Sequence, residues 1–136
     1  MEDYNRLATT LGEAMEGKAV WNHYVINDDG WWCYSKQLPV ADYREIRAVI
    51  SEVRFGRICD YQNVLVGLHL VFKREDGFFV NWEFTHMPDL QILFSKAKVT
   101  DLEDLVGTPM LVGMAGQRII SCKVNESLVV ERRKHS

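Results

Sequence analysis

Five aromatic side chains lie close together within residues 21–34, and Lys36 follows them. They are Trp21, Tyr24, Trp31, Trp32 and Tyr34. Exposed rings beside cations stack on nucleobases or clamp planar ligands, and stacking contributes about 1–3 kcal/mol per base. Successive residues of a strand point to opposite faces, so Trp31 and Trp32 cannot both enter one core face, and we expect one of them to be exposed or covered by a partner. The simpler interpretation is that one fills the core while the other packs under the first helix or in a dimer interface.

A second polar group falls in the predicted loop between two strands, where binding residues concentrate. It comprises Arg54, Arg57, Asp60, Tyr61 and Gln62. The forked guanidinium of Arg57 and the ring of Tyr61 would grip a phosphate or an acidic partner, although a solvated loop explains the same composition. The candidate ligand-binding residues are therefore Trp31, Trp32, Tyr34, Lys36, Arg54, Arg57 and Tyr61.

A histidine and a carboxylate are predicted to face each other on neighbouring strands. If Leu70 faces the core, His69 points outward beside Asn81 and Glu83, where an imidazole–carboxylate pair would form. A pair of this kind on a sheet face is more often a structural hydrogen bond or a solvated contact than a catalytic one. We assign no catalytic residue.

The familiar motifs of enzymes and cofactor sites are missing from the sequence. There is no GxSxG, GxGxxG or GxxxxGK[ST], and no HxH, HExxH or HxxxH pair among the four histidines. The cysteines have no neighbouring residue in the sequence that would identify an activated thiol. We therefore predict a protein that is not an enzyme and that holds neither a metal ion nor a cofactor.

Composition restricts the class of protein. With 136 residues, 47% of them hydrophobic, the chain suits one compact domain with its own core. Its net charge of -3 argues against a globally basic nucleic-acid binder. Three widely spaced cysteines, Cys33, Cys59 and Cys122, are expected to be reduced thiols. No signal peptide or bilayer-length apolar run is recognisable, so we expect a cytoplasmic protein without a membrane partner.

Residues 1–45 are expected to form a helix and an aromatic hairpin. Residues 5–17 place Leu7 and Leu11 on one apolar helical stripe. Segments 20–26 and 31–35 flank Asn27-Asp28-Asp29-Gly30, whose composition suits a chain reversal between two strands.

Residues 46–131 are expected to form the sheet and helix core, followed by a basic tail at 132–136. Strands are predicted at 47–55, 64–72, 78–84, 110–114 and 118–124, with a further edge strand at 128–131. A helix should begin near Pro88 and end near Lys98, and a capping box from Thr100 to Glu103 should open a single turn at 101–106. The fold class is α+β, a mostly antiparallel sheet covered by two short helices in a single domain. Exposed strand edges also favour a homo-oligomer.

The last two-thirds of the chain resembles a set of small phage and prophage proteins of unknown function. The matching stretches are residues 50–55, Cys59-Asp60-Tyr61, residues 64–72, and residues 99–112, which follow the form V-x-x-[WL]-E-x-L-x-G-x-P/Y-x-x-V. The glycine-rich hairpin mate of that set is replaced here by Phe78-Phe79-Val80-Asn81-Trp82. The resemblance implies a small accessory protein in the cytoplasm of an infected or lysogenic bacterial host. It also implies interference with host defence as one common employment.

These observations leave several hypotheses open. The first is a binding protein that sequesters a small anionic ligand, such as a signalling nucleotide, in a counter-defence role. The alternative is an inhibitor or adaptor that binds a host protein through exposed aromatic residues. An enzyme using His69, Glu83 or Cys59, and a protein that binds single-stranded nucleic acid, are less favoured.

Overall fold

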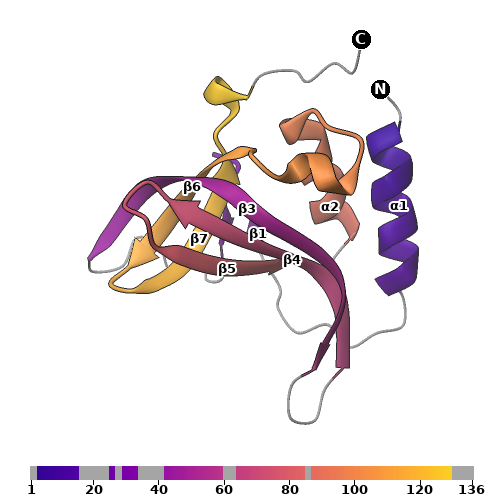
Figure 1. Cartoon of the computed structure of the whole chain (residues 1–136), viewed down its shortest axis with the longest axis horizontal. Coiled ribbons are helices and arrows are strands. Elements are labelled where there is room, and N and C mark those ends of the chain that lie inside the picture. The colour runs from indigo at the N-terminus through magenta and orange to yellow at the C-terminus, as the bar shows by residue number, and fades with distance from the viewer. Residues whose placement is uncertain are drawn as a thin grey trace.

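The chain forms one antiparallel sheet with two α-helices. The computed structural model describes residues 3–15, 25–26, 29–33, 42–59, 64–84 and 87–129. The strands are β1 (Val25–Ile26), β2 (Trp32–Cys33), β3 (Tyr43–Cys59), β4 (Val64–Arg74), β5 (Phe79–Phe84), β6 (Pro109–Ala115) and β7 (Arg118–Val124). Their order in the sheet is β1-β2-β7-β6-β3-β4-β5, and every pairing is antiparallel. The sheet curls strongly on itself (Figure 1). Its antiparallel strands, together with the two α-helices, confirm the predicted α+β class and the mostly antiparallel sheet.

The β4–β5 hairpin follows the pattern expected from its alternating sequence. Leu68, Leu70 and Phe72 are fully or almost fully buried, and Trp82 and Phe84 lie beside them on β5. Gly77 adopts a φ of 94° in the turn, a conformation that glycine adopts without steric cost. The hairpin is therefore positioned by its own residues, with one face on the core.

β3 is much longer than the strand predicted at 47–55, because it is shared by two neighbours. Residues 43–49 pair with β6, and residues from Ala48 onward pair with β4. The register with β4 shifts between Ile50 and Glu52, which is a β-bulge. Ile46, Ala48 and Ile50 face the core before the bulge, whereas Val53 and Phe55 do so after it. The bulge thus reverses which residues of β3 face the core, so that Glu52 and Arg54 lie on the outer face.

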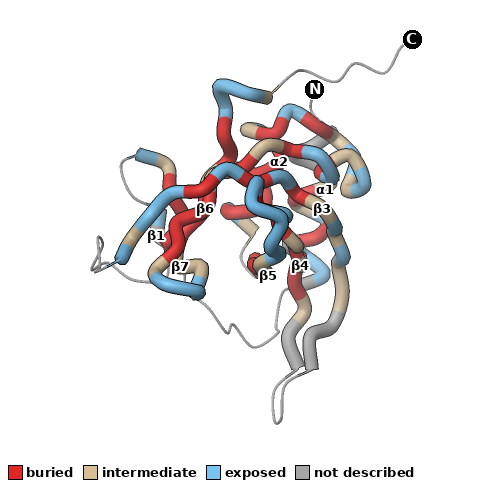
Figure 2. The backbone as a smooth tube through the Cα atoms, turned by 60° about the vertical axis from the view of Figure 1, so that its left-hand side comes forward, coloured by how far each residue is buried: buried red, intermediate tan, exposed pale blue. Residues whose placement is uncertain are grey.

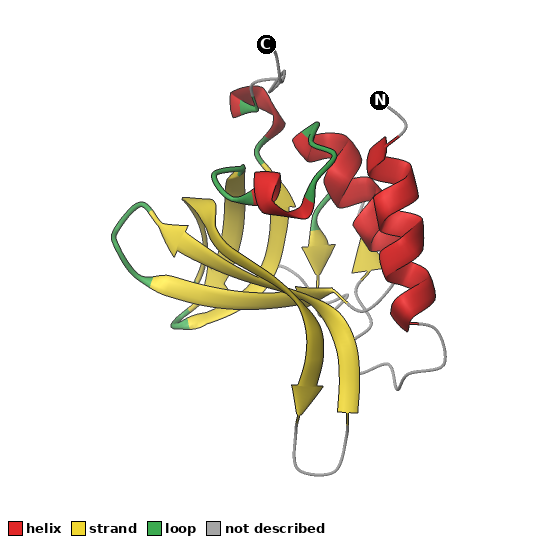
Figure 3. Cartoon of the chain, turned by 45° about the vertical axis from the view of Figure 1, so that its right-hand side comes forward, coloured by secondary structure: helices red, strands yellow, loops and turns green. Residues whose placement is uncertain are grey.

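The two helices, α1 (Asp3–Met15) and α2 (Met87–Ala97), stand side by side at one end of the curled sheet (Figures 1 and 3). Leu90, Leu93, Phe94 and Ala97 form the buried stripe of α2 that its sequence predicts. Ala8 and Leu11 of α1 join the same core. The expected covering of the sheet by helices is therefore local rather than complete.

One tryptophan connects the two ends of the curl. The Trp32 ring on β2 contacts the Phe84 ring on β5, with centroids 4.8 Å apart. Its indole Nε1–H donates to Asp89 Oδ1 of α2 at 3.1 Å. Buried segments run through β6, β7 and α2, and exposed ones lie at the hairpin turns (Figure 2). The curl brings β2, β5 and α2 to one core.

Two local predictions near the C-terminal end are wrong. The turn at Leu102–Leu105 is a 3₁₀-helix that begins after Asp101, so Thr100 is not its N-cap, and Asp101 makes no capping bond through its side chain. The second error is the edge strand predicted at 128–131. Leu128 instead ends another 3₁₀-helix, Glu126–Leu128, whose turn closes through Leu128 N–H to Asn125 O. Local hydrogen bonds took the place of strand pairing there, and residues beyond 129 lie outside the described chain.

Candidate functional site

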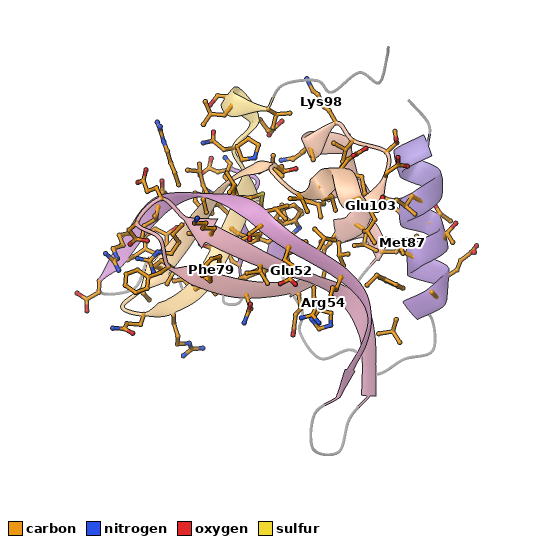
Figure 4. All side chains as sticks on the ribbon, viewed as in Figure 1. Glu52, Arg54, Phe79, Met87, Lys98 and Glu103 are labelled. Atoms are coloured by element: carbon orange, nitrogen blue, oxygen red, sulfur yellow. The ribbon has the colours of Figure 1, made fainter. Side chains whose placement is uncertain are left out.

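A shallow depression lies on the outer face of the sheet, the face turned away from the helical core, over β3, β4 and β5. The strand register sets Arg54, His69 and Glu83 in one row and Glu52, Val71 and Asn81 in the next. These six side chains, with Leu70 and Trp82, line a volume of about 140 Å³. Figure 4 shows Glu52 and Arg54 along β3, with Phe79 farther toward the tip of the β4–β5 hairpin. The bulge after Ile50 is what brings Glu52 and Arg54 to this face.

The predicted pair of His69 and Glu83 is present in this depression. His69 Nδ1 lies 3.7 Å from Glu83 Oε2, and both side chains are partly exposed. That distance is beyond hydrogen-bond range. Within the described residues no group of three or more His, Cys, Asp or Glu side chains is arranged to hold a metal ion.

The tryptophans are not exposed. Trp31 is 8% exposed and Trp32 is fully buried, so the prediction that one of them is exposed is wrong, whereas the interpretation that one fills the core is confirmed by Trp32. The prediction assumed that only one face of this hairpin is covered. Trp32 lies in the core, while Trp31 is buried on the opposite face, where Lys123 Nζ sits 5.6 Å from its ring centroid. Neither ring is available to stack on a ligand in this conformation.

The other predicted binding residues do not gather around the tryptophans. Arg54 lines the depression on β3, three strands away from β2 in the sheet order. Arg57 was expected in a loop, but its backbone continues β3 opposite Val66, and its side chain lies outside the described residues. Tyr34, Lys36 and Tyr61 also lie outside them. The structure thus separates Arg54 from Trp31 and Trp32.

The outer face is closed at the other end of the sheet, around Cys33. Tyr43 Oη and Ser121 Oγ are 3.2 Å apart, and Cys33 pairs with Ser121 in the strand register. A Cβ on Gly113 would lie 2.0 Å from Ser121 Oγ and 2.6 Å from Tyr43 Oη. The absence of a side chain at Gly113 therefore permits the close packing of this cluster.

Burial makes the described thiols poor nucleophiles. It raises the pKa of the Cys33 thiol, and it raises the pKa of the fully buried Cys122 thiol well above its usual value. Burial also raises the pKa of Tyr43, an effect that the hydrogen bond with Ser121 partly opposes. Since the thiolate is the reactive form, these two cysteines are unsuited to nucleophilic chemistry at neutral pH.

The exposed aromatic residues of the described chain lie at the tip of the β4–β5 hairpin. Phe78 is 65% exposed and Phe79 is 58% exposed. Arg74 lies over the Phe78 ring, with Cζ 5.3 Å from the centroid, and Lys73 Nζ lies 6.0 Å from the Phe79 centroid. Val49 of β3 is also exposed and lies opposite Lys73 of β4. In the strand register, Val49, Lys73 and Phe79 lie on the outer face, and Arg74 and Phe78 lie on the opposite one. We call these five residues, which surround the end of the hairpin on both faces, the hairpin-tip patch.

The sequence contained a signal for this patch that our prediction did not use. Phe78 and Phe79 are consecutive, so a strand cannot direct both into the core. At the turn, Arg74 also pairs with Asp76, and this interaction lowers the pKa of the Asp76 carboxyl. The tip is therefore held in place by its own cations and turn.

Comparison of the chain with protein-family models, with curated proteins and with solved structures gives no significant match. Among the described residues, no helix has the length and apolar character needed to cross a bilayer.

Proposed function

We propose that the protein is a non-enzymatic binding protein that recognises a protein partner through the hairpin-tip patch. The observation that carries the proposal is the exposure of two consecutive aromatic residues, Phe78 and Phe79, at the end of the β4–β5 hairpin. Aromatic side chains are the commonest anchors of protein interfaces, where a few residues supply most of the binding energy. The patch contains the only two consecutive exposed aromatic residues among the described residues.

The cations of the patch support a role in recognition. Arg74 Cζ lies 5.3 Å from the centroid of the Phe78 ring and Lys73 Nζ lies 6.0 Å from that of Phe79, so each exposed ring has a cation beside it. The partner surface that fits is apolar, with acidic groups able to meet Lys73. The resemblance to phage and prophage proteins suggests that this partner is a host protein and that the role is counter-defence in the host cytoplasm.

A small anionic ligand, such as a signalling nucleotide, is the second candidate. Arg54 and His69 in the outer-face depression favour it. Two observations weigh against it. The depression of about 140 Å³ is below the roughly 300–1,000 Å³ of usual ligand pockets. Glu52 and Glu83 in its lining would repel an anion.

The two cysteines with described side chains do not lie beside the His69–Glu83 pair. Within the described chain, His69 has an acidic partner in Glu83, but neither Cys33 nor Cys122 lines the same depression. A nucleophile must lie within hydrogen-bond reach of its base for covalent catalysis.

The test is capture of a partner from bacterial lysate by the tagged full chain and by the double variant Phe78→Ala, Phe79→Ala. The matched control is Leu128→Ala, because Leu128 is 49% exposed and lies outside the patch. We expect the wild type and the control to capture the same protein, and the double variant to bind the purified partner at least about tenfold more weakly. Equal binding by all three proteins would contradict the proposal.

A parallel measurement decides between the two candidates. Native mass spectrometry with mononucleotides, cyclic nucleotides and ADP-ribose derivatives reports any bound small molecule. A ligand bound at fixed stoichiometry, and lost on Arg54→Gln but not on the Phe78/Phe79 double substitution, would replace the protein partner with the anionic ligand.

A further inference from the structure

Among the described strands, β5 is the last in the sheet and has β4 as its neighbour on one side only. Arg74 N–H donates to Phe78 O at 2.8 Å, and the register continues from this pair without a shift. In an antiparallel ladder, every second residue directs both backbone groups at its neighbour, and the residues between them direct theirs away. Phe79, Asn81 and Glu83 therefore turn their N–H and C=O groups toward the open edge.

This edge lacks several of the features that usually block the addition of another strand. β5 contains no proline and no lysine, and its pairing with β4 has no bulge. The remaining edges differ. β1 is described over two residues only, and the part of β3 beyond β6 carries the bulge together with Glu52 and Arg54.

We propose that β5 pairs antiparallel with β5 of a second copy of this chain, about a two-fold axis at Asn81. Asn81 would then lie opposite Asn81 of the partner subunit, and Phe79 opposite Glu83 of the partner subunit. Each of the three opposed pairs uses backbone groups that point to the edge, so the interface forms about six backbone hydrogen bonds. The two sheets become one continuous antiparallel sheet.

The side chains on the outer face of β5 are complementary in this register. Within one chain, Lys73 Nζ lies 6.0 Å from the centroid of the Phe79 ring. In the dimer, Glu83 would adjoin the partner's Phe79, and the partner's Lys73 would lie beside that same ring. A carboxylate therefore meets a cation. Moving the axis by two residues would oppose either the two Glu83 side chains or the two Lys73–Phe79 pairs. Of these three registers, the one centred on Asn81 brings opposite charges together.

This inference does not depend on the proposed protein partner. Phe79 and Lys73 belong both to the hairpin-tip patch and to this interface, but pairing uses the backbone edge of β5, and Phe78 lies outside the opposed pairs.

The first test is sedimentation velocity of the full chain over a range of concentrations, for the wild type and for Asn81→Pro. Proline removes the N–H of Asn81, which points to the open edge, and leaves the hydrogen-bonded pairs with β4 in place. We expect a dimer whose dissociation constant rises at least about tenfold in this variant. Asn81→Ala is the control, because it keeps the N–H, and its dissociation constant should stay within a few-fold of that of the wild type.

A charge exchange provides the second test. If circular dichroism shows that Asn81→Pro does not fold, the charge exchange alone tests the proposed dimer. Glu83→Lys places two ammonium groups together and should weaken the dimer, and adding Lys73→Glu should restore it. A wild type that remains monomeric at every concentration would overturn the proposal. So would a dimer that neither the folded proline variant nor the charge exchange affects.

Discussion

The outer face of the sheet is open at one end and closed at the other. Over β3, β4 and β5 it carries a charged depression and part of the exposed hairpin-tip patch. Over β2, β7 and β6 the same face buries Trp31, Cys33 and Ser121. Strand alternation is the same at both ends, so alternation alone does not determine exposure. What covers a face decides which of its residues are available to a partner.

The largest expected effect comes from the residue that joins the closed end to the core. Trp32→Ala removes a fully buried indole that contacts Phe84 and donates to Asp89, and it should lower the free energy of unfolding by about 3–5 kcal/mol. Urea denaturation followed by circular dichroism measures this change. Phe79→Ala, at the open end, should change stability by less than about 0.5 kcal/mol. Similar losses for the two variants would remove the contrast between the two ends.

The second prediction concerns close packing at the closed end. Gly113→Ala should destabilise the protein by about 1–3 kcal/mol, because the added Cβ would lie 2.0 Å from Ser121 Oγ. Ser121→Ala removes that oxygen, so the double variant should recover part of the loss in a thermal-unfolding cycle. Independent, additive effects of the two substitutions would show that the contact does not limit packing.

The third prediction uses the buried thiols, one on each face of the β2–β7 region. In a Cys59→Ser background, Cys33 and Cys122 should react slowly with a thiol reagent at pH 8 and rapidly in denaturant, because burial raises both pKa values above 9.0. Fast reaction of Cys33 in the folded protein would mean that the outer face is not closed there.

The same raised pKa values predict how stability depends on pH. A group with a raised folded pKa contributes stability that is fully present below its unfolded pKa of 9.0 and is lost as the pH rises through the folded pKa. Urea midpoints should therefore fall between pH 8.5 and about pH 10.5. The fall should be smaller in Cys122→Ala, measured against its own midpoint at pH 8.5.

The smallest effect is expected at the open end. His69→Ala should change the free energy of unfolding by less than about 1 kcal/mol, because the His69 imidazole and the Glu83 carboxylate are 3.7 Å apart and both side chains are partly exposed. Glu83→Gln should behave in the same way, and the double variant should show almost no coupling. A coupling energy above about 1 kcal/mol would show that the pair contributes to stability, and that substitutions at the open end are less well tolerated than we expect.

Several elements were predictable because their cause is local. The alternation of Leu68, Leu70 and Phe72 and the stripe of Leu90, Leu93 and Phe94 repeat at the periods of a strand and a helix. The position of His69 opposite Glu83 follows from the same alternation once the hairpin turn is placed. Such patterns need only neighbouring residues to be interpreted.

The candidate sites depended on contacts that the sequence does not encode locally. Trp31 and Trp32 were predicted to bind a ligand because they are aromatic and adjacent, but both are buried. Arg54 reaches the depression only because a bulge after Ile50 changes the facing of β3. Neither the second covered face nor the bulge has a distinct signature in the sequence.

By itself, the sequence determined an α+β chain with an alternating hairpin, an amphipathic α2 and no recognisable catalytic motif, since periodicity and motif spacing are properties of short segments. Only the tertiary structure decided that the tryptophans are covered, that Phe78 and Phe79 are exposed, and that the edge of β5 is open. The physical reason is that exposure and edge position depend on which distant segments pack against a residue, and the curl of the whole sheet sets those contacts.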